Sequence, residues 1–384
     1  MSLTKSIKDA FLVIFISAFI LIFINLLLTA THSIIYTLRD STRYSHLPDP
    51  VKNNYQHMSK DDVDTLLSNN FDHGWVYDET LGFKEAPRTT QFVNVNKFGI
   101  RSTKREDDFI ASLNNSIWFF GGSTTFGYGV ADNETIPANL ASLLNSAVIN
   151  FGRGYYFSEQ ENLLMLKLLK NGYRPKKAIF LDGLNEQCSV TTYQEQMKRL
   201  FASAQKSHTT PFEYALNIMR PTLELFEKIS KVLRLDQRIA IAQNNDLHKL
   251  RCSGYGSEGK LSAALNHNLE HRNAICNHFN ISCTTFVQPL AGVHGQHNTP
   301  ELFRVSKQKL LRRFSELKPV FDQHGAISVT SSLDQHPEHA FVDNVHYSAA
   351  ANFLIAERIS HHLAISPFIE RAISGGGFPN SSAP

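Results

Sequence analysis

The chain has 384 residues, of which 42% are hydrophobic, and its 38 Lys and Arg side chains stand against 35 Asp and Glu. This length and apolar content suffice for one large folded domain with appended segments. The formal net charge of +3 is spread along the chain without a long basic block, which argues against nucleic acid as a partner.

The first predicted element is a long apolar helix near the N-terminus. Residues 10–30 carry no charged side chain, and a helix of this length can cross the roughly 30 Å hydrocarbon core of a bilayer. Lys5 and Lys8 precede it and no clear small-residue cleavage motif follows, which favours a retained anchor over a removed signal peptide. We expect residues 1–38 to anchor the chain, with the N-terminus inside and the body outside. The alternative is a buried helix of a soluble protein.

The segments around the expected body differ from it in composition. A polar stretch with scattered Pro, Asn and Asp over 39–75 predicts a loosely packed stalk or lead-in. The folded body is expected over 76–370. Within it, the polar, Lys- and Gln-rich segment 191–262 predicts a helical insertion, which either contacts a substrate or partner or forms an inert cap. The Gly- and Ser-rich end, 371–384, predicts a flexible tail.

Apolar runs of strand length alternate with helical patterns along the body. These runs cover 116–122, 147–152, 178–183, 283–290 and 326–332. The helix between the second and third runs opens with a capping box at Ser158 and Glu161 and closes near Gly172. Continuous apolar strands separated by helices indicate a parallel sheet with helices on both faces. The sequence therefore predicts an α/β fold.

Candidate catalytic residues stand at the ends of these elements, and parallel strands bring their carboxyl ends to one edge of a sheet. Ser123 follows the first run, where a hydroxyl can be exposed above the sheet. Asp343 precedes His346 by three residues in a late loop. The carboxylate can therefore accept the imidazole N–H while the other ring nitrogen serves as a base for Ser123. Each residue alone also fits a turn or a cap.

Candidate oxyanion donors follow the second and third runs. Asn185 comes after the third run, and its side-chain amide can donate to a developing negative charge together with the N–H of Ser123. Gly152 and Gly154 follow the second run, and either could add a backbone N–H. Singly, such residues are also common as turn formers.

Four segments, "GGST", "NFGRG", "GLNE" and "DNVH", occur in this order and together resemble the sequence blocks of the SGNH hydrolase superfamily, the GDSL-type esterases and lipases. The resemblance covers about residues 115–365 and implies a flavodoxin-like, three-layer α/β/α domain. Gly122 stands where the name motif of the family has Asp. This variant looks like the "GGST" branch of membrane-anchored bacterial members, which implies a single-pass protein of the bacterial inner membrane with its catalytic domain in the periplasm or otherwise outside the cytoplasm.

The resemblance also implies roles for individual residues. Ser123 would be the nucleophile of an acyl-serine mechanism, Asp343 and His346 would complete the triad, and Asn185 and one of the two glycines of the second block would form the oxyanion hole. We expect a serine esterase that removes O-acyl groups, in particular O-acetyl groups, from a glycan or envelope glycolipid. The alternatives are an O-acyltransferase on the same scaffold, a lipase or thioesterase, and a non-catalytic glycan-binding or assembly protein. The serine, base and oxyanion donors complete this chemistry, so we expect no metal and no organic cofactor.

Four cysteines, Cys188, Cys252, Cys276 and Cys283, lie in the part expected outside the cytoplasm, where disulfides persist. Cys276 ends a helical pattern and Cys283 opens an apolar run after a short turn. This arrangement favours a local Cys276–Cys283 bridge and leaves Cys188 to pair with Cys252, although three connectivities exist. The absence of a second closely spaced pair argues against a zinc site.

Overall fold

The computed structural model describes residues 3–38, 43–103, 112–188, 260–294, 307–334 and 339–374. Its chain divides into two compact units, and the second begins at Leu47. Apart from its last three residues, the expected insertion over 191–262 lies outside the described residues.

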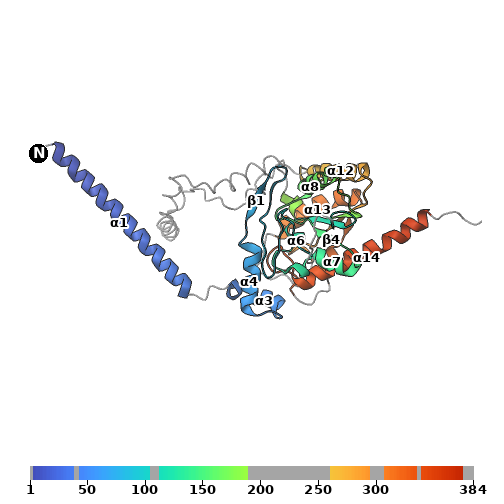
Figure 1. Cartoon of the computed structure of the whole chain (residues 1–384), viewed down its shortest axis with the longest axis horizontal. Coiled ribbons are helices and arrows are strands. Elements are labelled where there is room, and N and C mark those ends of the chain that lie inside the picture. The colour runs from blue at the N-terminus through green and yellow to red at the C-terminus, as the bar shows by residue number, and fades with distance from the viewer. Residues whose placement is uncertain are drawn as a thin grey trace, which may run out of the picture. The chain divides into compact units, whose positions relative to one another are not determined.

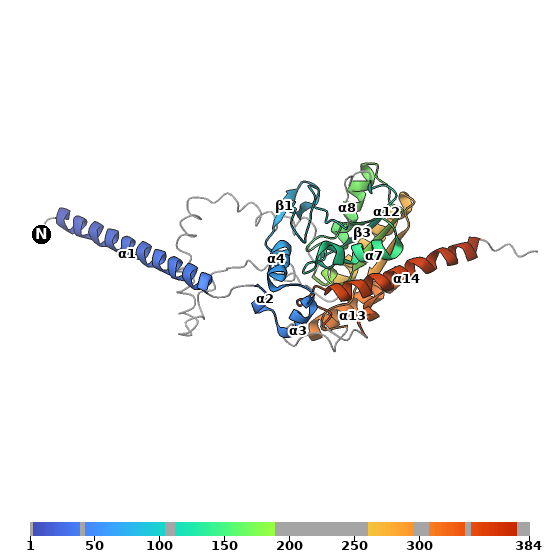
Figure 2. The same cartoon turned by 60° about the horizontal axis from the view of Figure 1, so that its bottom comes forward.

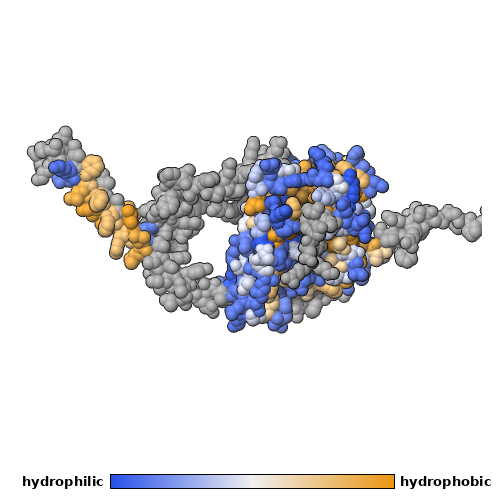
Figure 3. Space-filling model, in the orientation of Figure 1, coloured by the Kyte–Doolittle hydropathy of each residue, from blue (hydrophilic) through white to orange (hydrophobic). Residues whose placement is uncertain are grey.

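The first unit contains the apolar helix α1, Leu3–Leu38, and the short helix α2, Arg43–His46. Within α1, the stretch Phe11–Leu28 is long and apolar enough to cross a membrane, and no other helix in the described ranges is. Its large apolar side chains are exposed, with Phe11 at 70%, and Figure 3 shows hydrophobic residues along this helix. The helix is as predicted, and its insertion in a membrane stays a prediction.

The second unit is built on a five-stranded parallel sheet (Figure 1). In sheet order its strands are β4 (Val148–Asn150), β3 (Ile117–Gly121), β5 (Lys177–Asp182), β6 (Cys283–Val287) and β7 (Ile327–Ser328). Every run predicted from the sequence contributes one strand. Numbered along the chain within this sheet, the order is 2-1-3-4-5, which is the flavodoxin-like order. The predicted fold class is confirmed.

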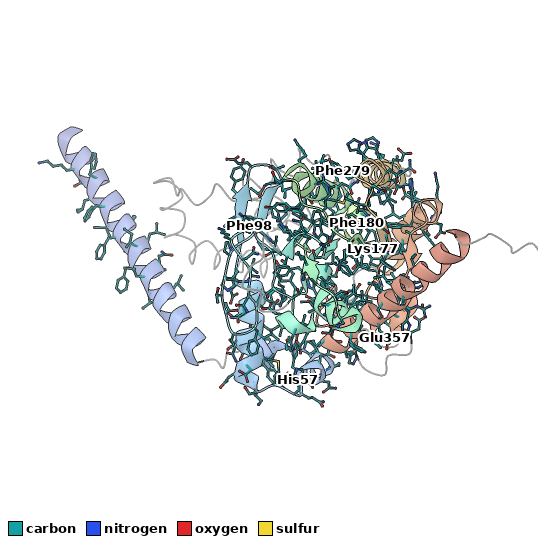
Figure 4. The ribbon with its side chains drawn as sticks, turned by 45° about the vertical axis from the view of Figure 1, so that its right-hand side comes forward. His57, Phe98, Lys177, Phe180, Phe279 and Glu357 are labelled. Atoms are coloured by element: carbon teal, nitrogen blue, oxygen red, sulfur yellow. A yellow bond between two sulfur atoms is a disulfide. The ribbon has the colours of Figure 1, made fainter. Side chains whose placement is uncertain are left out.

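Helices cover both faces of this sheet (Figures 1 and 2). Successive strand side chains point to opposite faces, so Phe119 lies in one apolar core and Phe120 in the other. The first core is shared with α7 (Ile136–Leu144) and α14 (Ala349–Ser374). The second, which includes Phe180 of β5 (Figure 4), is shared with α8 (Ser158–Lys170) and α12 (Lys260–His278). Helix α13, Lys307–Gln323, packs against α12. Single 3-10 turns lie at η1 (Asn53–Tyr55), η2 (Asp132–Glu134), η3 (Asn185–Cys188) and η7 (Thr330–Leu333).

The structure corrects the expectation of a loosely packed stalk over 39–75. From Leu47 onward this segment belongs to the second unit and forms α3 (Asp49–Lys52) and α4 (Lys60–Phe71). Val51, Val63 and Leu66 are fully buried. A hairpin of β1 (Trp75–Asp78) and β2 (Gly82–Glu85), which the sequence did not predict, follows directly. The polar composition hid this packing because only a few residues on one face of each short helix are apolar.

The disulfide prediction is confirmed for one pair. Cys276 at the end of α12 and Cys283 at the start of β6 form a disulfide. Cys252 lies outside the described residues, so its pairing with Cys188 stays a prediction. At the other end of the body, α14 continues to Ser374, so the first residues of the expected tail are helical and the rest of 371–384 lies outside the described residues.

Candidate active site

Ser123 lies at the carboxyl end of β3, where the strand turns into the short helix α6, Ser123–Phe126. It is partly exposed, whereas the three residues that follow it are buried. A Cβ atom at Gly122 would overlap the side-chain amide of Asn185. Glycine at this position therefore lets Asn185 reach the turn that carries Ser123. A side chain at position 122 would displace the Asn185 amide from this place.

Asn185 follows β5 and opens η3, at the same edge of the sheet as Ser123. Its Nδ2 donates to the carbonyl oxygen of Tyr156 at 2.6 Å, which ties the end of β5 to the loop after β4. The amide nitrogen carries two hydrogens and so can serve two acceptors. The structure therefore places Asn185 beside the turn that carries Ser123.

Asp343 and His346 form a tight local pair in the loop before α14. The Nδ1 atom of His346 lies 2.6 Å from Asp343 Oδ2, and Asp343 Oδ1 accepts the backbone N–H groups of Val345 and His346 at 2.7 Å each. Burial acts to raise the pKa of Asp343, but His346 and these hydrogen bonds outweigh it and hold the pKa below its ordinary value. Asp343 is therefore a carboxylate that fixes the imidazole with Nδ1 toward it.

The other imidazole nitrogen, Nε2, faces away from Asp343. His346 Nε2 is buried and has no hydrogen-bond partner within the described part of the chain. The imidazole ring packs against Tyr128, with ring centroids 5.4 Å apart. Tyr128 belongs to the turn that begins at Ser123, because its backbone N–H donates to Ser123 O at 3.3 Å. His346 therefore lies next to the turn that begins at Ser123.

Gln288, directly after β6, joins this turn to the loop that carries His346. The hydroxyls of Thr124 and Tyr347 both donate to Gln288 Oε1, at 2.7 and 3.1 Å. Thr124 follows Ser123, and Tyr347 follows His346. The sequence analysis did not include Gln288. Its place just after the fourth apolar run, at the same sheet edge, is the signal that could have found it.

The glycines of the second block have other roles than expected. The N–H of Gly152 donates to Asn150 Oδ1 at 2.9 Å, and the N–H of Gly154 donates to Glu85 Oε1 at 3.0 Å. Both donors are committed to side chains. This corrects the expectation that Gly152 or Gly154 offers its N–H to an oxyanion. Gly152 instead allows close packing, because a Cβ there would overlap the backbone of Phe126.

Glu85, the last residue of β2, is a buried acceptor that the sequence analysis missed. Its side chain is fully buried, and Oε1 accepts from the Tyr128 hydroxyl at 2.9 Å, from Trp75 Nε1 at 3.4 Å and from Gly154. Burial and the neighbouring Glu85 raise the pKa of Tyr128, so its hydroxyl keeps the proton that it donates. Glu85 therefore ties the hairpin to the turn beneath His346 and to the loop after β4.

A second buried cluster supports the loop of Asn185. Arg272 of α12 pairs with Asp182 at 2.6 Å and with Glu161 at 3.1 Å. Glu186, the neighbour of Asn185, accepts the N–H groups of Gly183 at 2.7 Å and of Ser158 at 3.1 Å. Burial and Asp182 raise the pKa of Glu186 to about 7. These bonds hold the carboxyl end of β5 against the start of α8. Among the described residues, no three His, Cys, Asp or Glu side chains are grouped so that they could hold a metal ion.

No protein-family model and no curated protein sequence matches the chain. Among solved structures, it is similar to a carbohydrate acetylesterase from Sinorhizobium meliloti, with 15% identity, a TM-score of 0.32, and 66% of this chain and 99% of that chain covered. It is also similar to a member of the lipolytic G-D-S-L family from Veillonella parvula, with 10% identity and a TM-score of 0.35. That match covers 63% of this chain and 94% of the other. A third similar structure is an α/β hydrolase enzyme from the metagenome of Lake Arreo, with 12% identity and a TM-score of 0.34. That match covers 63% of this chain and 91% of the other. Likenesses this distant leave the activity to be argued from the geometry of the site.

Proposed function

We propose that the protein is a serine esterase in which Ser123, His346 and Asp343 act as a triad. The observation that carries the proposal is the His346 imidazole. Asp343 holds its Nδ1 at 2.6 Å, its Nε2 is buried and has no partner among the described residues, and the ring packs on the turn that carries Ser123. A neutral imidazole held in this way has its lone pair on Nε2, which is what a general base for a serine requires.

In the first half of the reaction, Ser123 Oγ attacks the carbonyl carbon of an ester and its proton passes to His346 Nε2. The carbonyl oxygen becomes an oxyanion, which the backbone N–H of Ser123 and the side-chain amide of Asn185 would stabilise. At the start of α6 the Ser123 N–H has no acceptor within its own helix. The C–O bond to the alcohol then breaks, and His346 gives its proton to the departing oxygen.

In the second half, water takes the place of the alcohol. His346 removes a proton from the water as it attacks the acyl carbon, and the same proton returns to Ser123 Oγ when the acyl–serine bond breaks. The products are a carboxylic acid and the free enzyme. Asp343 remains ionised and stabilises the imidazolium in both halves, consistent with its lowered pKa.

We place this activity outside the cytoplasm, on a chain anchored by α1, and propose O-acetyl groups of a glycan or envelope glycolipid as the substrate. Three features support this. Phe11–Leu28 has the length and composition of a membrane span, and Cys276 and Cys283 form a disulfide of the kind that persists outside the cytoplasm. The four sequence blocks resemble those of SGNH hydrolases, and the "GGST" form of the first block looks like that of membrane-anchored bacterial members.

A fluorophosphonate probe tests the proposal, because it bonds covalently to a serine that a histidine activates. The wild-type protein should gain one adduct by intact-mass measurement, and peptide mapping should place it on Ser123. Ser123→Ala should gain none. Ser146→Ala is the matched control, since this serine lies before β4, at the opposite end of the sheet, and its hydroxyl donates to Leu144 O at 3.2 Å. This variant should label as the wild type does. An adduct on another serine, or none on the wild type, would overturn the proposal.

A further inference from the structure

Phe71, the last residue of α4, presents a flat apolar surface beside the base. Its ring is 40% exposed, although it stacks on Tyr128 with centroids 5.5 Å apart and planes 24° apart. Its centroid lies 6.3 Å from that of His346, in an edge arrangement. One face of the phenyl ring is therefore packed against the site, and the exposed remainder faces the solvent from which a substrate arrives.

The support beneath Phe71 is rigid. Asn70, its neighbour, donates from Nδ2 to Val130 O at 3.3 Å and to Leu66 O at 2.9 Å, which fixes the end of α4 to the turn after α6. Tyr128 is buried beneath the phenyl ring, and its hydroxyl donates to Glu85 at 2.9 Å. A ring held by such contacts loses little conformational freedom when a ligand covers it, so it is suited to binding.

The chemistry of the triad indicates which half of an ester would meet this ring. The acyl carbon becomes bonded to Ser123, whereas the alcohol oxygen must receive its proton from His346 Nε2 as it leaves. That oxygen therefore lies at hydrogen-bond distance from Nε2, about 3 Å. Since Phe71 contacts the same imidazole, the first group attached to the alcohol oxygen lies within reach of the phenyl ring.

We infer that Phe71 binds the alcohol portion of the ester and that this portion is a sugar ring, whose flat C–H face covers the phenyl ring. The inference rests on the proposed function and assigns the side chain that recognises the sugar of its substrate. The face of an aromatic ring carries partial negative charge, which attracts the polarised C–H bonds of a sugar. A small aliphatic alcohol has no such face to offer.

The contact should act in one half-reaction only. The alcohol leaves, with the proton from His346, when the acyl-serine forms. Water later attacks an acyl-enzyme from which the sugar has departed, so Phe71 has no partner in that step. Loss of the phenyl ring should therefore lower kcat/KM for sugar esters, mainly by raising KM. The rate at which the acyl-enzyme is hydrolysed should not change.

The experiment compares methyl glucoside acetates with ethyl acetate as substrates for the full-length protein. Phe71→Ala should lower kcat/KM for the sugar esters about 2- to 13-fold, and that for ethyl acetate less than twofold. Phe71→Trp should keep the sugar activity, because the indole ring offers a flat face too. The matched control is Phe98→Ala. Phe98 has a similar exposure, 38%, and lies in the loop after β2 (Figure 4). This variant should hydrolyse both esters as the wild type does.

Two results would overturn the inference, and they differ from failure of the proposed function. If Phe71→Ala lowers activity equally on both esters, the ring supports His346 and does not bind sugar. If Phe71→Ala cleaves both esters as well as the wild type does, the ring has no part in binding. A wild-type protein that neither reacts with the fluorophosphonate nor hydrolyses ethyl acetate would instead overturn the proposed function, and this inference with it.

Discussion

Asn185 allows a sharp test because its amide makes a hydrogen bond in the folded protein and is also proposed to donate to the oxyanion. Replacing Asn185 with alanine removes the 2.6 Å hydrogen bond to Tyr156 O, which should cost about 1 kcal/mol of stability. It also removes a donor to the oxyanion, whose charge is present chiefly in the transition state. Loss of one such donor lowers kcat by about 10²- to 10³-fold, which corresponds to about 2.7 to 4 kcal/mol. The catalytic loss should therefore exceed the structural one.

The assay is hydrolysis of a small aryl acetate, with kcat and KM measured separately, together with thermal unfolding of each variant. Asn185→Ala should have a lower kcat and nearly the same KM, since the ester carries no full charge to stabilise before the reaction begins. Asn352→Ala is the matched control, because the Asn352 amide also donates to a carbonyl, Glu134 O at 3.1 Å, and it should lose stability without losing kcat. An Asn185→Ala variant that is folded and keeps wild-type kcat, or that changes KM alone, would refute the oxyanion role.

The remaining predictions concern stability and topology. Burial lowers the pKa of His294 to about 4, so the folded protein keeps this imidazole neutral where the unfolded chain protonates it; stability should be full above pH 6.5 and fall as the pH drops toward 4. His294→Gln should reduce that fall, measured by urea unfolding at pH 7 and pH 5. Replacing Cys276 and Cys283 with alanine should cost about 2 to 3 kcal/mol in the same measurement, because the bridge closes a short loop. An alkaline phosphatase fused after Pro384 should be active, and a reporter that works only in the cytoplasm should be inactive there.

Each of these has an outcome that contradicts it. Equal acid sensitivity of His294→Gln and the wild type would mean that another group carries the pH dependence. A double cysteine variant as stable as the wild type would show that the bridge between α12 and β6 adds nothing to packing. A phosphatase fusion without activity, paired with a working cytoplasmic reporter, would place the body inside the cytoplasm and remove the extracytoplasmic part of the proposal.

The sheet was predictable because its strands are buried on both faces. The run Ile117–Gly121 is buried at every position, so its sequence is continuously apolar, and the same is true of most of Lys177–Asp182. Such runs stand out from the amphipathic helices between them. The pairing of Asp343 with His346 was equally accessible, because two side chains three residues apart in one loop meet through local geometry alone.

The loop after β4 and the β1–β2 hairpin were not predictable in this way. Which way the N–H of Gly152 or Gly154 points depends on the backbone of the loop, where Tyr155 adopts a left-handed φ of 66°, and composition does not reveal this. Glu85 accepts from Gly154, 69 residues away in sequence, and nothing local marks a single Glu at a strand end as a buried acceptor. In β1, the two central residues are exposed, which leaves little alternation to recognise.

The central claim is that Ser123 carries the acyl group between the two half-reactions, and trapping that species tests it most directly. Full-length protein mixed with an aryl acetate and quenched in acid within the first turnover should carry one acetyl group per chain, and peptide mapping should place it on Ser123. His346→Ala, which keeps the hydroxyl but lacks the base, should show no acetylation on this timescale. An acetyl group on another residue, or ester hydrolysis by the wild type without any acetylated protein, would contradict the account.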